Sequence, residues 1–373
     1  MLSRALDEFG AVTLHNRKYL GSKVRLLDFI EREILSAAGK VGSFFDGFAG
    51  TGVVADRMRS YTSRLTLVDN LASNYSINRA FFTSSEANVR IAYVADALRE
   101  LNQLEPAHGY AREHYGGRYF THDNAGRIDA IRDRIALRMR DRDCTEQEQH
   151  VLIASLLLAA DKVANTVGQY DAYLKSLGSA AYDANGRHVV DSNVYGRLRL
   201  RMPVLRFAAD ATVLRADVNE VAADHEADVA YLDPPYNDRQ YVDCYHVLEN
   251  ITRWTKPPLH GKTRKFDRDA LKSDYSRRRT ARAAFARLVE RVRARLIVVS
   301  YSNEGLMSVD DLRETLATRG PTTIESSDYP VFGNGAGQSV RRRVVEYLAI
   351  CRVDLTGNIK RCTRSAVSAV SSL

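Results

Sequence analysis

The 373-residue sequence predicts an α/β protein built on a parallel sheet, with a mainly helical insertion. Two observations lead to this fold class. Short apolar runs that end in an acid alternate with helix-like stretches near both ends of the chain, as in βαβ units. The middle of the chain lacks this alternation and carries apolar residues at helical spacing instead.

The expected strands and helices follow from these patterns in chain order. Residues 43–46 (SFFD) and 65–69 (LTLVD) are strand-like, and a helix is expected over residues 72–82. Because these runs are short and apolar, we expect strands that are buried on both faces of the sheet. Four later strands are expected at residues 212–217, 228–233, 296–301 and 344–351.

The central interruption divides the chain into two regions. Its most apolar stretch, residues 151–163 (VLIASLLLAADKV), predicts a long buried helix. We therefore expect a catalytic domain formed by residues 1–96 and 211–355, and an insertion at residues 97–210. Residues 356–373 are Ser-rich and are expected to form a flexible tail.

Composition narrows the class of protein. Hydrophobic residues make up 45% of the chain, enough for a substantial core, and no apolar run reaches the roughly 20 residues of a membrane span. The first ten residues carry acids and do not resemble a secretory signal, so we expect a cytoplasmic protein. The four cysteines form no Cys-x-x-Cys pair, so we expect neither a disulfide framework nor a metal site.

Positive charge is concentrated in one segment. Residues 256–295 contain 14 Lys or Arg against 4 Asp or Glu, an excess of +10, whereas the whole chain carries +8. The rest is therefore close to −2. A concentrated basic segment on a nearly neutral body suits a phosphate-binding surface, although a solvated helix face or a linker would have the same composition.

A glycine-rich turn follows the first expected strand. Residues 46–52 read Asp-Gly-Phe-Ala-Gly-Thr-Gly and precede a helix-like stretch, so backbone amides could approach a ligand closely. Asp69 ends the next strand, where an acid can accept hydrogen bonds from both ribose hydroxyls of a nucleoside. The sequence has neither a P-loop nor a Gly-x-Gly-x-x-Gly fingerprint. This combination favours a nucleoside ligand without a pyrophosphate, such as S-adenosylmethionine.

Asp233-Pro234-Pro235-Tyr236 is the most informative stretch and follows an expected buried strand. The two prolines remove amide donors and fix the backbone, which leaves carbonyl and carboxylate acceptors for an NH₂ group. Adenine N6 is a poor nucleophile because its lone pair is delocalised, and two acceptors would localise that lone pair toward a methyl donor. Tyr236 offers a ring for stacking. The alternative is that these four residues have only a structural role, as a turn that ends the strand.

Together these motifs resemble the alpha group of adenine-N6 DNA methyltransferases, the Dam-like class, and are most similar to adenine methylases of type II restriction-modification systems. Residues 16–23 (NRKYLGSK) resemble the N-terminal motif of that group, residues 46–52 its cofactor motif, and residues 233–236 its catalytic motif. The order of the motifs is also that of the alpha group. The resemblance implies a Rossmann-like S-adenosylmethionine-dependent methyltransferase sheet with a target-recognition insertion.

The resemblance also implies roles for individual residues. The catalytic residues would be Asp233, Pro234, Pro235 and Tyr236. The cofactor would be bound by Lys18, Tyr19, Lys23, Asp46, Phe48, Gly50, Gly52, Asp69 and Asp217. Within that set, Asp69 would bind the ribose and Asp217 would lie near the adenine of the cofactor. Asp96 competes for the role of Asp217, but residues 91–101 show helical spacing, so we prefer Asp217.

Double-stranded DNA is the expected partner, and a cognate restriction endonuclease could be encoded nearby. We expect a monomer that does not bind membranes. The main candidates for DNA contacts are Arg118, Lys175, Arg239, Arg277, Arg278 and Arg279. Further candidates are Tyr119, Arg127, Arg132, Tyr170, Arg187, Arg197, Arg199, Asn334 and Arg341–Arg343. Each is more often a phosphate contact or a solvated charge than a reader of bases.

Two other functions remain open at this point. A related enzyme could methylate another planar amino group, in RNA adenine or a protein glutamine, although those families usually carry Asn-Pro-Pro-Tyr. The chain could also be a binding subunit that keeps the fold without the activity. The intact Asp233, Tyr236, Asp46 and Gly50 argue against that second alternative.

Overall fold

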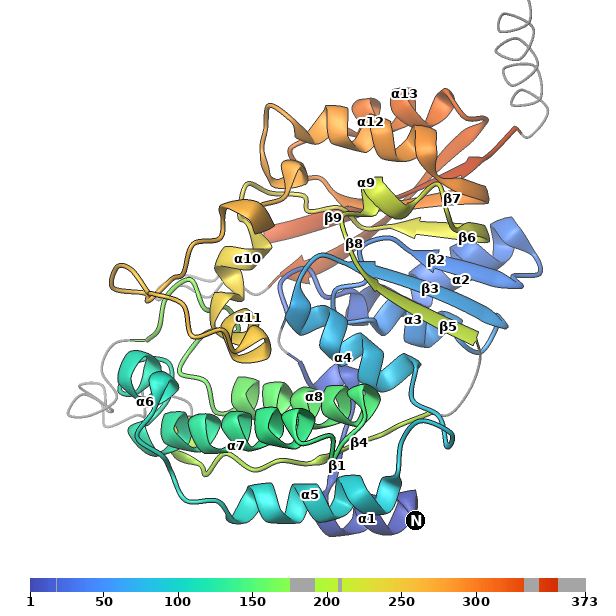
Figure 1. The fold of residues 1–373 in the computed structure, drawn as a ribbon. Helices are drawn as coiled ribbons and strands as arrows, with labels where there is room; N and C mark the ends of the chain where they lie inside the picture. Colours follow the sequence, from blue (N-terminus) through green and yellow to red (C-terminus); the bar gives the residue numbers. More distant parts are fainter. Residues whose placement is uncertain (18, 175–191, 207–209, 332–341, 355–373) are drawn as a thin grey trace, which may run out of the picture.

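A computed structural model describes the chain except for residues 18, 175–191, 207–209, 332–341 and 355–373 (Figure 1). Its centre is a seven-stranded sheet with the order β5-β3-β2-β6-β7-β9-β8. The strands are β2 (Ser43–Asp46), β3 (Arg64–Asp69), β5 (Asp210–Arg215), β6 (Glu226–Leu232), β7 (Arg293–Ser302), β8 (Thr322–Val331) and β9 (Arg342–Arg352). The first five strands in this order are parallel, and β9 runs antiparallel to both β7 and β8.

The six strands expected from apolar runs are confirmed, with ends that shift by up to three residues. The expectation of a parallel sheet holds for its larger part and is wrong for β8 and β9. The sequence pattern did not predict β8, whose residues TTIESSDYPV are mostly polar. Because β8 is an edge strand, it needs no continuous apolar run, and its pairing with β9 supplies its hydrogen bonds.

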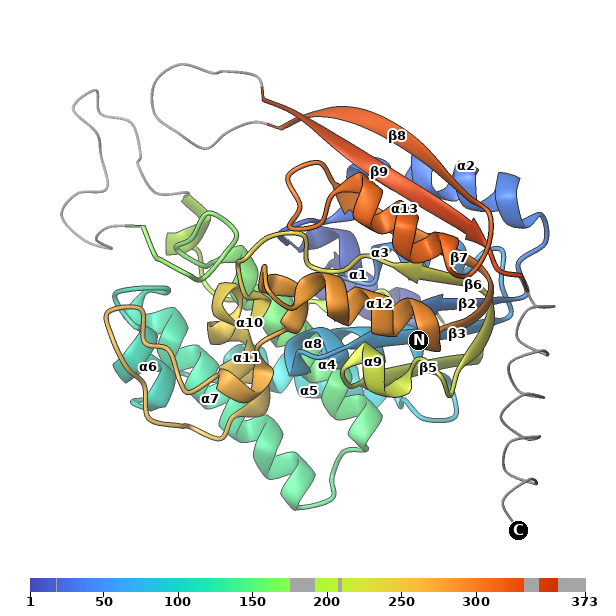
Figure 2. The same ribbon diagram turned by 90° about the horizontal axis from the view of Figure 1, so that it is seen from above.

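Alternate residues of each central strand enter two separate hydrophobic layers. Phe45 and Leu232 face the layer formed with α9 (Val218–Val221), α12 (Ala281–Arg291) and α13 (Val309–Ala317). Phe44 and Tyr231 face the opposite layer. That layer is formed with α2 (Leu27–Ala38), α3 (Val53–Met58) and α4 (Ala72–Phe82). Figures 1 and 2 show these helices on the two faces of the sheet, as expected for a doubly covered parallel sheet.

The helical section packs directly against the sheet layer that contains α4. Its helices are α5 (Ile91–Gln103), α6 (Tyr110–Tyr115), α7 (His122–Arg140) and α8 (Glu146–Lys162), joined by α1 (Leu2–Phe9), α10 (Tyr241–Cys244) and α11 (His246–Arg253). α8 is buried along most of its length and contacts α4 extensively. The proposed boundary between residues 96 and 97 falls inside α5. A short parallel pair, β1 (Ala11–Val12) with β4 (Met202–Pro203), ties the N-terminus to this section.

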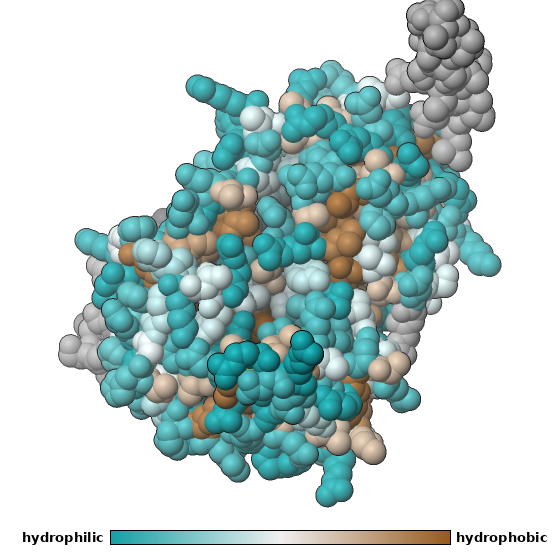
Figure 3. Space-filling model, in the orientation of Figure 1, coloured by the Kyte–Doolittle hydropathy of each residue, from teal (hydrophilic) through white to brown (hydrophobic). Residues whose placement is uncertain are grey.

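One face of the molecule is largely polar. Hydrophilic side chains cover most of the face drawn in Figure 3, and apolar side chains form only small patches there. No helix in the described parts of the chain is long and apolar enough to cross a membrane. Cys144, Cys244 and Cys351 are buried free thiols, and Cys362 lies outside the described residues.

A buried carboxylate joins the helical section to the sheet layer. Glu249 of α11 accepts hydrogen bonds from the backbone amides of Ala72 and Ser73, at 3.1 and 3.0 Å, at the start of α4. We expect Glu249→Ala to lower the free energy of unfolding by about 2–4 kcal/mol, because two buried amides would lose a charged acceptor. Denaturant unfolding would measure this loss. Glu249→Gln keeps an acceptor oxygen and should cost less, and the exposed Glu220→Ala should change little. Equal stability of all three variants would contradict this role.

Candidate active site

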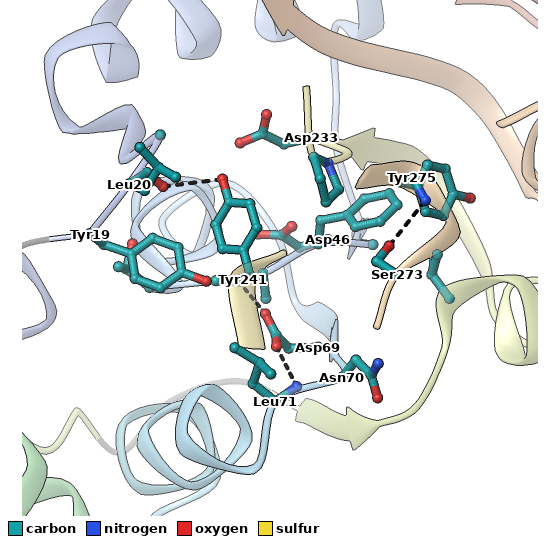
Figure 4. A pocket seen from close by; sticks show the side chains of 18 of the residues that line it. Tyr19, Leu20, Asp46, Asp69, Asn70, Leu71, Asp233, Tyr241, Ser273 and Tyr275 are labelled. Atoms are coloured by element: carbon teal, nitrogen blue, oxygen red, sulfur yellow. Dashed lines mark hydrogen bonds between the residues drawn. The ribbon is translucent and has the colours of Figure 1, made fainter. Parts of the chain in front are cut away.

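Three acidic residues meet at the carboxyl edge of the sheet. Asp46 ends β2, Asp69 ends β3, and Asp233 directly follows β6. Because β2 lies between β3 and β6, these side chains come from adjacent parallel strands. All three line one pocket of about 980 Å³, its open mouth included (Figure 4). Ligands bind at this edge in open α/β sheets.

Two glycines of the glycine-rich turn have left-handed backbone conformations. Gly50 and Gly52 adopt positive φ angles of 50° and 77°, and Gly52 is the N-cap of α3. Gly50 lines the pocket, whereas Gly52 does not. A Cβ atom on Gly52 would lie 2.4 Å from Oδ1 of Asn78, so this position needs glycine for the close approach of α4. Gly52 therefore allows the turn to pack closely against α4, whereas Phe48 and Gly50 line the pocket.

Asp69 anchors that turn. Its Oδ2 accepts from the backbone amide of Gly50 at 2.8 Å and from Nδ2 of Asn74 at 3.0 Å, while Oδ1 accepts from the amide of Leu71 at 2.8 Å. Burial raises the pKa of Asp69 to about 6, and these hydrogen bonds oppose the rise. A carboxylate has about four acceptor positions, so Oδ1 retains capacity for a ligand hydroxyl. Asn74 also donates to the hydroxyl of Tyr19 at 2.9 Å.

Asp46 carries the strongest sign of a missing partner. Its side chain is buried, and Oδ1 has no hydrogen-bond partner among the described residues. Burial, reinforced by the negative charge of Asp233, raises the pKa of Asp46 to about 8. Buried polar atoms are almost always hydrogen-bonded. An unpaired carboxylate oxygen in the wall of a pocket therefore suits a cationic or hydrogen-donating ligand.

The structure separates the two candidates for the adenine-proximal acid. Asp217 lines the pocket and caps α9 by accepting from the amide of Asn219 at 2.8 Å. Asp96 lies on the exposed face of α5, where it pairs with Arg99 at 2.6 Å. Of Asp96 and Asp217, only Asp217 can therefore contact a ligand in this pocket.

Aromatic side chains close the pocket on two sides. Phe48 and Tyr275 meet edge to face with ring centroids 5.0 Å apart. Tyr19 stacks on Tyr245 at 4.5 Å, and Tyr241 lies beside both rings. Tyr19 thus takes a packed position in the pocket wall, while Lys18 lies outside the described residues.

Sequence reasoning missed part of this wall. Leu271, Ser273 and Tyr275 line the pocket although they belong to the basic segment. Gln240 holds this stretch in place, because its side chain donates to the carbonyl of Ser273 at 3.0 Å and accepts from the amide of Ser273 at 2.7 Å. The apolar residues around Tyr275 could have indicated that this stretch is buried, but the many charged residues beside them favoured an exposed segment.

The tetrad meets the same pocket. Asp233 and Pro235 line it, and Pro234 is buried behind them. Tyr236 packs beside the segment that carries Tyr19, since a Cβ on Gly21 would lie 3.3 Å from the Tyr236 ring. The carbonyl of Tyr236 accepts from the amide of Leu306 at 2.8 Å, which fixes the backbone after the prolines.

Lys23 contacts the tetrad directly. Its ammonium lies 2.9 Å from Oδ1 of Asp233 and 3.1 Å from Oε1 of Glu346 in β9. Lys23 was expected to bind the cofactor, and it lines the pocket. Glu346 was not expected to belong to the site. An isolated acid inside the apolar run VVEYLAIC was the signal that could have revealed it.

The expected DNA contacts divide into exposed and buried side chains. Arg277, Arg278 and Arg279 are exposed, Arg118 is half-buried, and Arg239 is exposed but pairs with Asp171. Arg197 and Arg199 are also exposed. Lys175, Arg187, Asn334 and Arg341 lie outside the described residues, and Arg342 and Arg343 begin β9.

Four of the further candidates are wrong for direct DNA contact because they are buried. Tyr119 and Tyr170 have no exposed surface, and Arg127 and Arg132 are 3% and 5% exposed. Arg132 donates to the carbonyls of residues 251 and 252, and Arg127 donates to those of residues 102, 104 and 198. These arginines donate hydrogen bonds to backbone carbonyls of chain segments that lack regular hydrogen-bond partners. Their charge therefore led to the prediction of exposed side chains, whereas both side chains are buried.

A glycine-rich turn, strand-ending acids and an Asp-Pro-Pro-Tyr loop around one pocket define an α/β methyltransferase. Residues 19–315 match the family described as D12 class N6 adenine-specific DNA methyltransferase, and the chain belongs to this family. The sheet and the helices on both of its faces agree with a Rossmann-like methyltransferase fold.

Three curated relatives of this chain are named type II methyltransferases. The type II methyltransferase M.NlaIII of Neisseria lactamica is 32% identical over 84% of this chain and 92% of its own length. The type II methyltransferase M.CviAII of Paramecium bursaria Chlorella virus 1 is 32% identical over 88% of this chain and 96% of its own. For M.FokI of Planomicrobium okeanokoites, identity is 31% over 81% of this chain, which spans about half (47%) of that relative.

Proposed function

We propose that this chain transfers a methyl group from S-adenosylmethionine to N6 of an adenine that is flipped out of double-stranded DNA, at one short recognition sequence. The observation that carries this proposal is the position of Asp233 in the same pocket as Asp46 and Asp69. One cavity thus offers acids for a cofactor and an acceptor for a target amino group.

The pocket suits the charge of S-adenosylmethionine, which has a sulfonium, an ammonium and a carboxylate. Asp46, Asp69, Asp217 and Asp233 line it, whereas its one lysine among the described residues, Lys23, is paired with two carboxylates. Asp69 and Asp217 would hold the nucleoside end, and Asp46 with the glycine-rich turn would hold the remainder. When bound, the cofactor supplies an electrophilic methyl group.

The tetrad prepares the nucleophile. Asp233 and the carbonyls fixed by the two prolines accept hydrogen bonds from the amino group, and Tyr236 offers a ring for stacking. The N6–methyl bond forms as the sulfur–methyl bond breaks, and sulfur keeps the electron pair. N6 then gives up one proton, which the Asp233 carboxylate can accept. The base must first leave the duplex, because its amino group is inaccessible in the stack.

We further propose that the enzyme is the modification partner of a restriction endonuclease encoded nearby and acts as a cytoplasmic monomer. The names of M.NlaIII, M.CviAII and M.FokI as type II methyltransferases support the first part. Residues 97–210 would recognise the target sequence, and residues 1–96 with 211–355 would carry out catalysis.

Long-read modification sequencing of DNA from cells that express the protein tests this function, with Asp233→Ala as the control. We expect N6-methyladenine at one short motif only with the intact protein. Methylation of RNA or of a protein glutamine, without DNA methylation, would favour the related chemistries. Cofactor binding without any transfer would favour a binding subunit.

The exposed arginines of the basic segment are expected to contact phosphates. Replacing Arg278 and Arg279 together by Gln should weaken DNA binding at all sequences alike. It should also reduce the slope of log affinity against log salt by about 0.9 for each lost contact. Arg293→Gln is the matched control, because this exposed arginine of the same segment starts β7 at the opposite edge of the sheet. Equal slopes for both variants would exclude Arg278 and Arg279 from the DNA-binding surface.

A further inference from the structure

A buried lysine is shared between two carboxylates, one of which belongs to the tetrad. Lys23 ends the N-terminal motif, Asp233 follows β6, and Glu346 lies in β9, so three distant parts of the chain converge. The side chains of Lys23 and Glu346 are 6% and 2% exposed, and that of Asp233 is 18% exposed. Ser300 of β7 donates to the same oxygen of Glu346 at 2.5 Å. Glu346 is therefore fixed by two donors, and it does not line the pocket, whereas Asp233 does.

The charges around this cluster do not cancel. One ammonium faces two carboxylates, which leaves a net charge of −1 when both are ionised, and Asp46 adds a further acid nearby. Tyr231 and Tyr241 also face the cluster, and burial raises the pKa of both phenols well above the usual value. They therefore remain neutral. Burial opposes the charge of Lys23, but Asp233 and Glu346 outweigh it and hold its pKa well above the usual range.

The two neighbours of Asp233 act on it in opposite directions. Burial raises the pKa of Asp233 to about 6, Lys23 lowers it, and Glu346 raises it. Lys23 engages Oδ1, and Asp233 lines the pocket. Oδ2 is therefore the oxygen available to a target amino group.

We propose that Glu346 is a positioning residue that shares the charge of Lys23, so that Asp233 stays oriented yet keeps its strength as an acceptor. This inference rests on the proposed function. A lysine that paired with Asp233 alone would neutralise it just where positive charge develops on N6 during transfer. With Glu346 behind the ammonium, the cluster remains net negative toward the transition state. Lys23 then fixes Oδ1, and Oδ2 receives the amino hydrogen.

Single-turnover methylation as a function of pH tests this division of roles. In Glu346→Gln, we expect the rate at pH 7.5 to fall roughly tenfold, and the acid limb of the profile to move to lower pH, because Lys23 then acts on Asp233 alone. In Lys23→Met, the acid limb should move to higher pH, so the deficit should shrink as pH rises. Glu325→Gln, an exposed glutamate of the neighbouring strand β8, should leave the profile unchanged.

The double variant Lys23→Met/Glu346→Gln separates this role from a loss of packing. If Glu346 acts through Lys23, its replacement should add little once Lys23 is absent. A wild-type rate and profile in Glu346→Gln, or additive losses in the double variant, would overturn the inference. Thermal melting and S-adenosylmethionine binding of each variant would show whether a loss of rate reflects unfolding. Absence of adenine methylation by the wild-type protein would instead refute the proposed function.

Discussion

Asp233→Ala is expected to slow methylation of adenine by at least about 10³-fold, the scale seen when a preorganised group at the reacting atom is removed. The carboxylate lies in the pocket, 2.9 Å from Lys23, and presents an acceptor to the amino group. Without it, the lone pair of N6 stays delocalised and its developing charge has no counterpart. Lys23 keeps Glu346 as a partner, so the buried ammonium is not left alone. The variant should therefore fold.

Single-turnover rates with a duplex that contains the recognition sequence would measure this loss. S-adenosylmethionine binding, measured by calorimetry, should change far less than the rate, because the proposed ribose contact is at Asp69, which also anchors the glycine-rich turn at Gly50. Asp233→Asn keeps one acceptor oxygen and should retain part of the activity. If Asp233→Ala methylated at a rate close to that of the wild type, the tetrad would be only a turn that ends a strand.

The part of the site built by local sequence could be predicted. Asp46, Asp69 and Asp233 each end or follow a short apolar run, and parallel strands bring such ends to one edge of a sheet. The glycine-rich turn could also be predicted from local sequence, because Gly50 and Gly52 adopt the positive φ angles that favour glycine.

The remainder depends on contacts between distant segments. Glu346 and Lys23 are separated by most of the chain, and only the pairing of β7 with β9 brings the glutamate behind the tetrad. Arg127 and Arg132 show the converse problem, because charge in a sequence does not reveal that backbone carbonyls will surround it. Tyr275 was hidden by the charged residues beside it. Local patterns therefore predicted the acids that line the pocket but not the residues that position them.

Asp69→Ala is expected to weaken S-adenosylmethionine binding by at least about 100-fold. Hydrogen bonds to a charged group contribute roughly 1.5–3 kcal/mol each, and the variant would lose any bond from the ribose to Oδ1. It would also release the amides of Gly50 and Leu71, which Asp69 holds at 2.8 Å. The glycine-rich turn would then lose its anchor to β3. Two effects thus act in the same direction, because the contact and the shape of the pocket are lost together.

Calorimetric titration of S-adenosylmethionine would measure this change, with Asp96→Ala as the matched control. Asp96 is an acid of similar chemistry on the exposed face of α5, so its removal should leave the affinity unchanged. Asp69→Asn should be intermediate, because its one remaining carbonyl oxygen can accept from Gly50 or from a ribose hydroxyl but carries no charge. An unchanged affinity in Asp69→Ala would mean that the nucleoside does not lie over β3. The pocket would then have to bind its ligand through Asp46 and Asp217, which also line it.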